Sequence, residues 1–258
     1  MTIVQLHPAA AAERRVYIWI ATVTALIAFV AVMPTYWLQL PAGTFRGSVL
    51  LHVHVLLFSA WPLLFLAQTW LAARGRLERH RAWGVAGVSL ATAMVIIGLA
   101  SAHERLLYAL GQGYGDAARA FLIVQVSGIA LFGAALAAAA LTAPRHPEWH
   151  KRLMIVATAS LLQAPLARIP FLLVTGGGPG VRPGLVAPPP VWLTTPTSMA
   201  PNLLLLAGLI YDIRTRGRPH PAYPVGLAVT ALAVLLRPPL SHTHAWLAFA
   251  DAFARIAG

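Results

Sequence analysis

The sequence predicts an all-α polytopic transmembrane bundle of about seven helices, with its N-terminus inside the cell and a short C-terminal interfacial helix. Three observations lead to this prediction: the composition, the length of the apolar segments and the placement of the basic residues. The 258-residue chain is 59% hydrophobic and 10% charged and has a mean hydropathy of +0.72, whereas soluble domains carry about 25% charged residues. So few charged side chains cannot cover a globule in water, which indicates lipid as the solvent for much of the surface.

Seven apolar segments are long enough to cross a bilayer, which takes about 20 residues of helix. Aromatic side chains cluster at the ends of these segments, as is typical of helices that end at the level of the lipid headgroups. We expect one transmembrane domain over residues 1–258. The predicted spans are 16–33, 49–72, 83–102, 117–141, 153–174, 191–213 and 223–236.

The basic residues predict the orientation. An excess of Lys and Arg in short loops marks the cytoplasmic side of a membrane, and with the N-terminus inside, twelve of the nineteen lie on that side. These twelve are Arg14, Arg15, Arg74, Arg76, Arg79, Arg81, Arg145, Lys151, Arg152, Arg214, Arg216 and Arg218. The outer segments hold Arg46, Arg105, Arg119, Arg182, Arg237 and Arg255, and Arg168 lies within a span.

The last part of the chain predicts a short helix. Beyond Pro238 and Pro239, the tail from Ser241 alternates apolar residues with Asp251 and Arg255. Residues four apart share a helix face, so this pattern predicts an amphipathic helix on the outer membrane surface. The glycine- and proline-rich stretch 175–198 predicts an irregular outer loop.

Several function classes are excluded by what the sequence lacks. Without cysteine the chain cannot hold disulfides, iron–sulfur clusters or thiolate zinc, so a metal or haem would need histidine or methionine. No basic stretch is long enough to follow a phosphate backbone, which argues against nucleic-acid binding despite a net charge of +12. No hydrolase motif occurs.

Two histidines share one setting on the inner side. His80 precedes Arg81 where the third span begins, and His150 precedes Lys151 and Arg152 where the fifth begins. Histidines at one depth on parallel helices are suited to be axial ligands of a b-type haem, and the neighbouring cations would suit its propionates. The alternatives are that these basic residues anchor the topology, or that they bind anionic lipid headgroups or another anion.

A further histidine, His54, lies about two turns into the second span. At that depth its ring needs a partner, either a hydrogen bond from a neighbouring helix or ligation of a haem or metal. His103, at the outer end of the third span, is one candidate partner. His52 cannot share a small site with His54, since residues two apart point in different directions on a helix.

The order of these residues resembles a group of uncharacterised bacterial multi-pass membrane proteins. The shared pattern is a His near the start of one helix, a Gln near its end and a basic loop closing with His-Arg-x-x-Gly, here His54, Gln68 and His80-Arg81-Ala82-Trp83-Gly84. The segments 147–154 and 211–221 extend the resemblance to about two-thirds of the chain. It implies a multi-pass protein of the bacterial cytoplasmic (inner) membrane.

A weaker resemblance is to haem-binding bundles of the cytochrome b561 and ferric-reductase type. Those families pair histidines between alternate helices on each side of the membrane, as His80 and His150 would on the inner side. The outer side departs from that pattern, because the fourth span carries Gln125 and no histidine to face His54. The resemblance therefore implies one haem at most.

Three functions follow as hypotheses. The first is a b-type haem protein that transfers electrons or serves a respiratory complex, with His80, His150 and His54 as ligands and Arg81, Lys151 and Arg152 as anion contacts. The second is a carrier, or a protein that binds lipid or another anion. The third is a non-catalytic membrane scaffold subunit. All three have the lipid bilayer as a partner, and other membrane subunits are further candidates.

Overall fold

The structure, a computed structural model, describes residues 8–256, and side chains from residue 12 onward. It is 81% helical, and the described residues contain no strand. The long helices are α1 (Pro8–Val32), α2 (Val49–Ala73), α3 (Leu77–Gly111), α4 (Gly115–Thr142), α5 (Pro147–Leu161), α6 (Gln163–Thr175), α8 (Asn202–Arg216) and α9 (Ala222–Ser241). The short ones are η1 (Met33–Thr35), η2 (Pro183–Leu185), η3 (Val191–Thr194), α7 (Thr195–Met199) and α10 (His244–Ala254).

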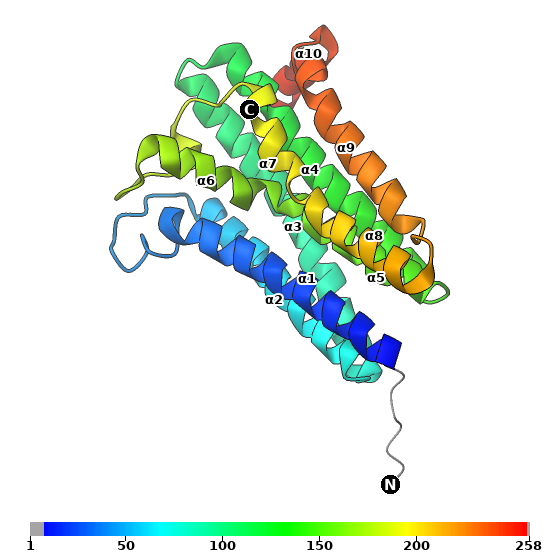
Figure 1. The fold of residues 1–258 in the computed structure, drawn as a ribbon. Coiled ribbons are helices and arrows are strands. Elements are labelled where there is room, and N and C mark those ends of the chain that lie inside the picture. Colours follow the sequence, from blue (N-terminus) through cyan, green and yellow to red (C-terminus); the bar gives the residue numbers. More distant parts are fainter. Residues whose placement is uncertain (1–7, 257–258) are drawn as a thin grey trace.

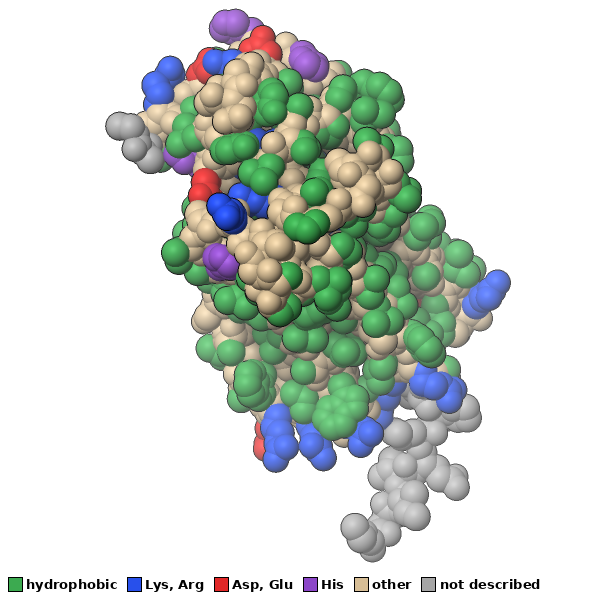
Figure 2. All heavy atoms as spheres, turned by 90° about the vertical axis from the view of Figure 1, so that its left-hand side faces the viewer, with side chains coloured by type: hydrophobic (Ala, Val, Ile, Leu, Met, Phe, Trp, Pro, Cys, Tyr) green, Lys and Arg blue, Asp and Glu red, His purple; other side chains and the backbone are tan. Residues whose placement is uncertain are grey.

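These helices form seven segments that are long and apolar enough to cross a membrane, which confirms the predicted fold class. The segments are Ala12–Thr35, Val49–Ala73, Leu77–Gly111, Gly115–Thr142, Pro147–Thr175, Val191–Arg216 and Ala222–Ser241. Large apolar side chains such as Leu173, Leu203 and Val229 are exposed along them. Hydrophobic side chains cover much of the face in Figure 2, and Lys and Arg side chains gather at its lower end. The orientation in the membrane stays a prediction.

The segments run up and down beside one another (Figure 1). α1 packs against α2 and α6, while α9 packs against α4, α5 and α8. A buried cluster joins these groups, with Ile20 of α1, Phe65 of α2, Ile155 of α5, Leu205 of α8 and Tyr223 of α9. The packing brings the start of α5 to the same end of the bundle as the start of α3 and the end of α8 (Figure 1). The basic residues predicted to face the cytoplasm lie in these segments.

Two of the seven segments are broken. The fifth is interrupted at Leu162, between α5 and α6, and the sixth consists of η3, α7 and α8. Proline accounts for the second break, because Pro196 in the first turn of α7 and Pro201 just before α8 lack the N–H that a continuous helix uses. Broken helices within a membrane protein leave backbone groups that must find partners inside the protein.

Several helix ends differ from the sequence prediction. α3 continues to Gly111 rather than ending at residue 102, and α9 continues through Pro238 and Pro239 to Ser241 rather than ending at residue 236. In both cases the polar or proline-containing end remains helical because it packs within the bundle. Ala102, Leu106 and Ala109 of α3 lie in a buried cluster with Ala250 of α10.

The C-terminal helix is present as α10, and it packs on α3 and α4. Its Asp251 carboxylate accepts a hydrogen bond from Arg119 of α4 at 2.6 Å, rather than pairing with Arg255. Trp246 Nε1 donates to the Arg119 carbonyl at 2.9 Å. These contacts fix α10 against the end of the bundle, and its position at the membrane surface stays a prediction.

Candidate functional site

His80 and His150 are brought together at the basic end of the bundle. Their ring centroids lie 6.2 Å apart and the ring planes are nearly perpendicular, at 82°. His80 is in the first turn of α3 and His150 in the first turn of α5. Both side chains are half-buried. The sequence prediction that these two histidines face each other is therefore consistent with the packing.

Backbone carbonyl groups hold both rings in one orientation. His150 Nδ1 lies 2.9 Å from the carbonyl oxygen of Ala139 in α4, and His80 Nδ1 lies 3.3 Å from that of Gln68 in α2. Since a carbonyl oxygen only accepts, each Nδ1 must carry the proton and each neutral ring keeps its lone pair on Nε2. Neither Nε2 atom has a hydrogen-bond partner among the described residues.

Gln68 adds a second contact to this pair. Its side-chain Nε2 donates to the carbonyl oxygen of His80 at 2.9 Å, so α2 and the start of α3 are joined twice. Gly84 lies one helical turn further along, and a Cβ there would be in ordinary contact with the Gln68 amide. Gln68, His80 and Gly84 of the sequence pattern thus meet in one place, whereas His54, the first residue of that pattern, lies near the other end of α2.

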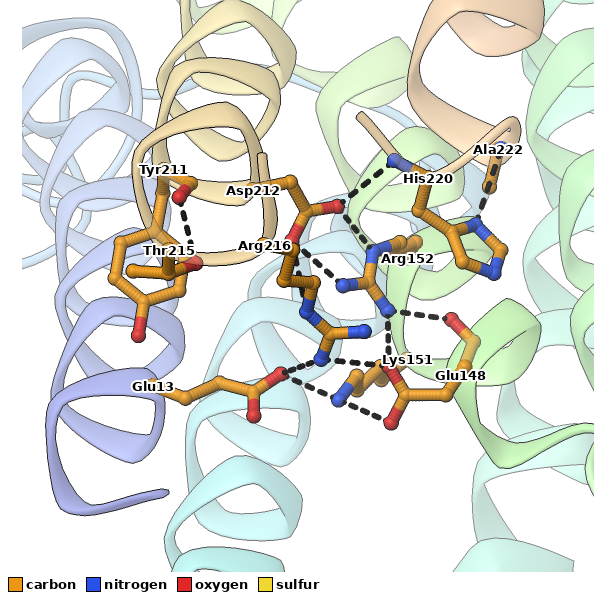
Figure 3. A network of polar contacts seen from close by, with 10 residues as sticks. All are labelled: Glu13, Glu148, Lys151, Arg152, Tyr211, Asp212, Thr215, Arg216, His220 and Ala222. Carbon is orange, nitrogen blue, oxygen red and sulfur yellow. Dashed lines mark hydrogen bonds and ion pairs between the residues drawn. The ribbon is translucent and has the colours of Figure 1, made fainter. Parts of the chain in front are cut away.

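Beside the pair, three cations and three carboxylates form a network that fixes the start of α5 (Figure 3). Arg152 is fully buried and makes a two-pronged ion pair with the buried Asp212 of α8, at 2.9 and 2.7 Å. Its Nη1 also donates to the Glu148 carboxylate at 2.7 Å. The network is completed by Lys151, Arg216 and Glu13.

This network changes the role expected of Lys151 and Arg152. Both cations are already held by carboxylates, Lys151 by Glu13 at 2.5 Å and by Glu148 at 2.6 Å, so an incoming anion would have to displace those partners. Arg81 is different, since it is exposed and forms no ion pair with the described residues. Of the three anion contacts expected from the sequence, Arg81 is the one whose charge is available.

His220, in the turn between α8 and α9, joins the network through its backbone. Its N–H donates to Asp212 Oδ2 at 3.2 Å, and its ring Nδ1 accepts from the Ala222 N–H at 3.2 Å. Burial lowers the pKa of His220, and the charge of Arg152 acts in the same direction. Nδ1 can accept this hydrogen bond only if the ring is neutral. The His220 ring thus provides an acceptor for the N–H of Ala222, the first residue of α9.

The outer histidines do not come together. His54 is stacked on Phe58, with ring centroids 4.1 Å apart, and its buried Nδ1 has no hydrogen-bond partner among the described residues. His103 lies instead against α10, where its Nε2 is 3.3 Å from the carbonyl oxygen of Ala254. His103 is therefore not the partner of His54, and within residues 8–256 the His54 ring does not form the interhelical hydrogen bond that was one of the two expectations.

Sequence reasoning missed two buried arginines. Arg152 was interpreted as a loop cation at the membrane surface, but its partner Asp212 lies 60 residues away and can be recognised only in the fold. Arg237 was placed in an outer segment because the following prolines suggested a helix end; it is instead buried within α9, at 2% exposure. The signal available for Arg237 was its position directly after an unbroken apolar run.

No protein-family model, curated protein or solved structure matches this chain. Its class follows from the fold alone: with seven apolar helices of spanning length, the chain is a multi-pass integral membrane protein.

Proposed function

We propose that His80 and His150 hold a b-type haem at the basic end of the bundle, and that the protein takes part in electron transfer in the bacterial cytoplasmic membrane. The observation that carries the proposal is the pair of perpendicular imidazoles, 6.2 Å apart, with both Nδ1 atoms bonded to backbone carbonyls. Metal-ligating histidines characteristically donate their other ring N–H in this way, which fixes the ring and raises the basicity of the ligating nitrogen.

The spacing of the rings fits two axial ligands. With about 2.0–2.1 Å for each metal–nitrogen bond, two imidazoles on opposite sides of one metal have ring centroids about 6 Å apart. The described residues contain no group of three or more His, Asp or Glu side chains that could hold a metal ion. A two-histidine site is complete for a haem, whose porphyrin supplies the other four ligands, and such a haem would provide one-electron redox chemistry.

The residues around the pair would position the ligands and the charge. The carbonyls of Gln68 and Ala139 hold the rings, and the Arg152–Asp212 ion pair holds the helix that carries His150. Arg81 is the cation open to a propionate. An anion or lipid site at Lys151 and Arg152 is less well supported, because their charges are already balanced by Glu13, Glu148 and Asp212.

An absorption spectrum of the detergent-purified protein, expressed with ample haem, tests the proposal. We expect a Soret band and α and β bands that sharpen when dithionite is added, with about one haem per chain. His80→Ala and His150→Ala should each lose this spectrum, whereas His150→Met should keep a haem at a higher potential, since a Met axial ligand raises the potential.

The matched control is His146→Ala, which removes an exposed histidine four residues before His150. It should leave the spectrum unchanged, and gel filtration and circular dichroism would show that each variant is folded. A wild-type spectrum without haem bands would overturn the proposal and favour a carrier or scaffold. So would haem retained in both alanine variants but lost in His54→Ala, which would place the site near the outer side.

A further inference from the structure

A second polar site lies inside the bundle, around Arg237 of α9. This side chain is 2% exposed although it lies within a helix that is long and apolar enough to span the membrane. A buried cation in such a segment is costly, and it is retained where the interior offers it a partner or a ligand. Arg237 lies on the half of α9 far from the histidine pair, so the two sites are distinct.

The partners of Arg237 in the structure are all neutral. Its Nε donates to Ser127 Oγ of α4 at 2.8 Å, and its Nη1 donates to Gln163 Oε1 at 2.7 Å and to Ser198 Oγ at 3.1 Å. Among the described residues, its Nη2 donates no hydrogen bond and its charge meets no carboxylate within ion-pair distance. Two N–H donors of Arg237 are therefore without an acceptor in the described residues, and its positive charge is not balanced by a carboxylate there.

Arg237 borders a small recess of about 10 Å³, comparable to the space that one water-sized occupant needs. The recess lies where both broken segments change direction, at the start of α6 and at the start of α8. Neither start has a side-chain cap, and both bring the positive end of a helix dipole near this place. The first N–H groups of α8 are not free, because those of Leu203 and Leu204 donate to the carbonyl oxygens of Ala200 and Pro201. Its polar lining residues are Ser160, Gln163, Ser198, Asn202, Thr230 and Arg237.

We infer that this recess is a binding site for a small monovalent anion of about the size of chloride. The anion would accept hydrogen bonds from Nη2 of Arg237 and balance its buried charge, which no described carboxylate balances. The size of the recess excludes a phosphate or a lipid headgroup. The buried cation, its unused donors and the positive ends of two helix dipoles all favour negative charge at one point.

The test is thermal unfolding of the purified protein in chloride against gluconate at equal ionic strength, combined with ³⁵Cl NMR line broadening. For the wild type we expect a saturable rise of the unfolding midpoint in chloride, about 2–4 °C near saturation, and broadening that bromide competes away. An equal midpoint in both salts, together with no competable broadening, would overturn the inference.

The decisive variant is Gln163→Glu. It places a carboxylate where Gln163 Oε1 now accepts from Arg237, so the fold should remain while the site is neutralised. We expect the chloride-dependent shift and the broadening to disappear, and Arg237→Gln, if it folds, to lose them as well. Arg145→Gln, which removes an exposed cation outside both proposed sites, is the control and should respond like the wild type. A Gln163→Glu protein with the full wild-type chloride response would show that the ion binds elsewhere.

Discussion

Replacing Asp212 with alanine is expected to destabilise the protein by about 3–5 kcal/mol, the range observed when one partner of a buried ion pair is removed. Arg152 and Asp212 have side-chain exposures of 0% and 2% and are joined by two hydrogen bonds of 2.9 and 2.7 Å. Without the carboxylate, a guanidinium remains in the interior with part of its charge uncompensated. The measurement is equilibrium unfolding by SDS in mixed micelles, followed by circular dichroism.

The control for this prediction is Asp251→Ala. Asp251 also pairs with an arginine, Arg119, but its side chain is 41% exposed, and exposed pairs contribute about 0–1 kcal/mol. The double variant Arg152→Leu/Asp212→Leu removes both charges and should be less destabilised than Asp212→Ala. If Asp212→Ala and Asp251→Ala lost the same small amount of stability, the buried network would not hold α5 against α8.

Adding one methyl group at Gly208 should also be severely destabilising, by about 1–3 kcal/mol or more. A Cβ at this position of α8 would overlap the ring and hydroxyl of Tyr223 in α9. Tyr223 is 1% exposed and lies in the central cluster, so its ring has no free space into which it can move. The same SDS unfolding measurement on Gly208→Ala checks this prediction.

Gly111→Ala is the matched control, because no atom of the part of the chain that the structure describes lies within 4 Å of a Cβ built at this helical position. It should be neutral or slightly stabilising, since alanine restricts the unfolded chain more than glycine does. Coupling between Gly208→Ala and Tyr223→Phe would identify the contact directly. A Gly208→Ala variant as stable as Gly111→Ala would mean that α8 and α9 pack less closely than described.

The prediction of the spans succeeded where hydropathy and helix length coincide. The second span was predicted to within one residue at its end, Ala72 against Ala73, because a basic loop with a glycine follows directly. The third and fifth failed at their polar ends. Residues 103–111 and 147–152 are helical although polar, and hydropathy alone cannot distinguish a polar residue in water from one satisfied inside the protein.

Part of the candidate site could be predicted from the order of the spans. His80 and His150 could be matched from the sequence because each precedes a span that begins on the predicted inner side. The topology therefore places both at one membrane depth. Their carbonyl partners, Gln68 and Ala139, could not be anticipated, since these contacts depend on how α2 and α4 are rotated. The prediction that His103 is the partner of His54 was wrong, because His103 contacts Ala254 of α10, a helix that is not one of the spans.

The sequence by itself determined that this protein is built to cross a membrane and the number of its spanning segments, which is seven. In a chain with 59% hydrophobic and 10% charged residues, apolar runs of spanning length satisfy their backbone groups as helices, whatever the arrangement of those helices, because lipid offers no hydrogen bonds. Only the tertiary structure decided which of the few charged groups meet. Arg152 found Asp212, and Arg237 found neutral partners alone, because a pairing between distant residues depends on helix rotation and packing, which no local pattern encodes.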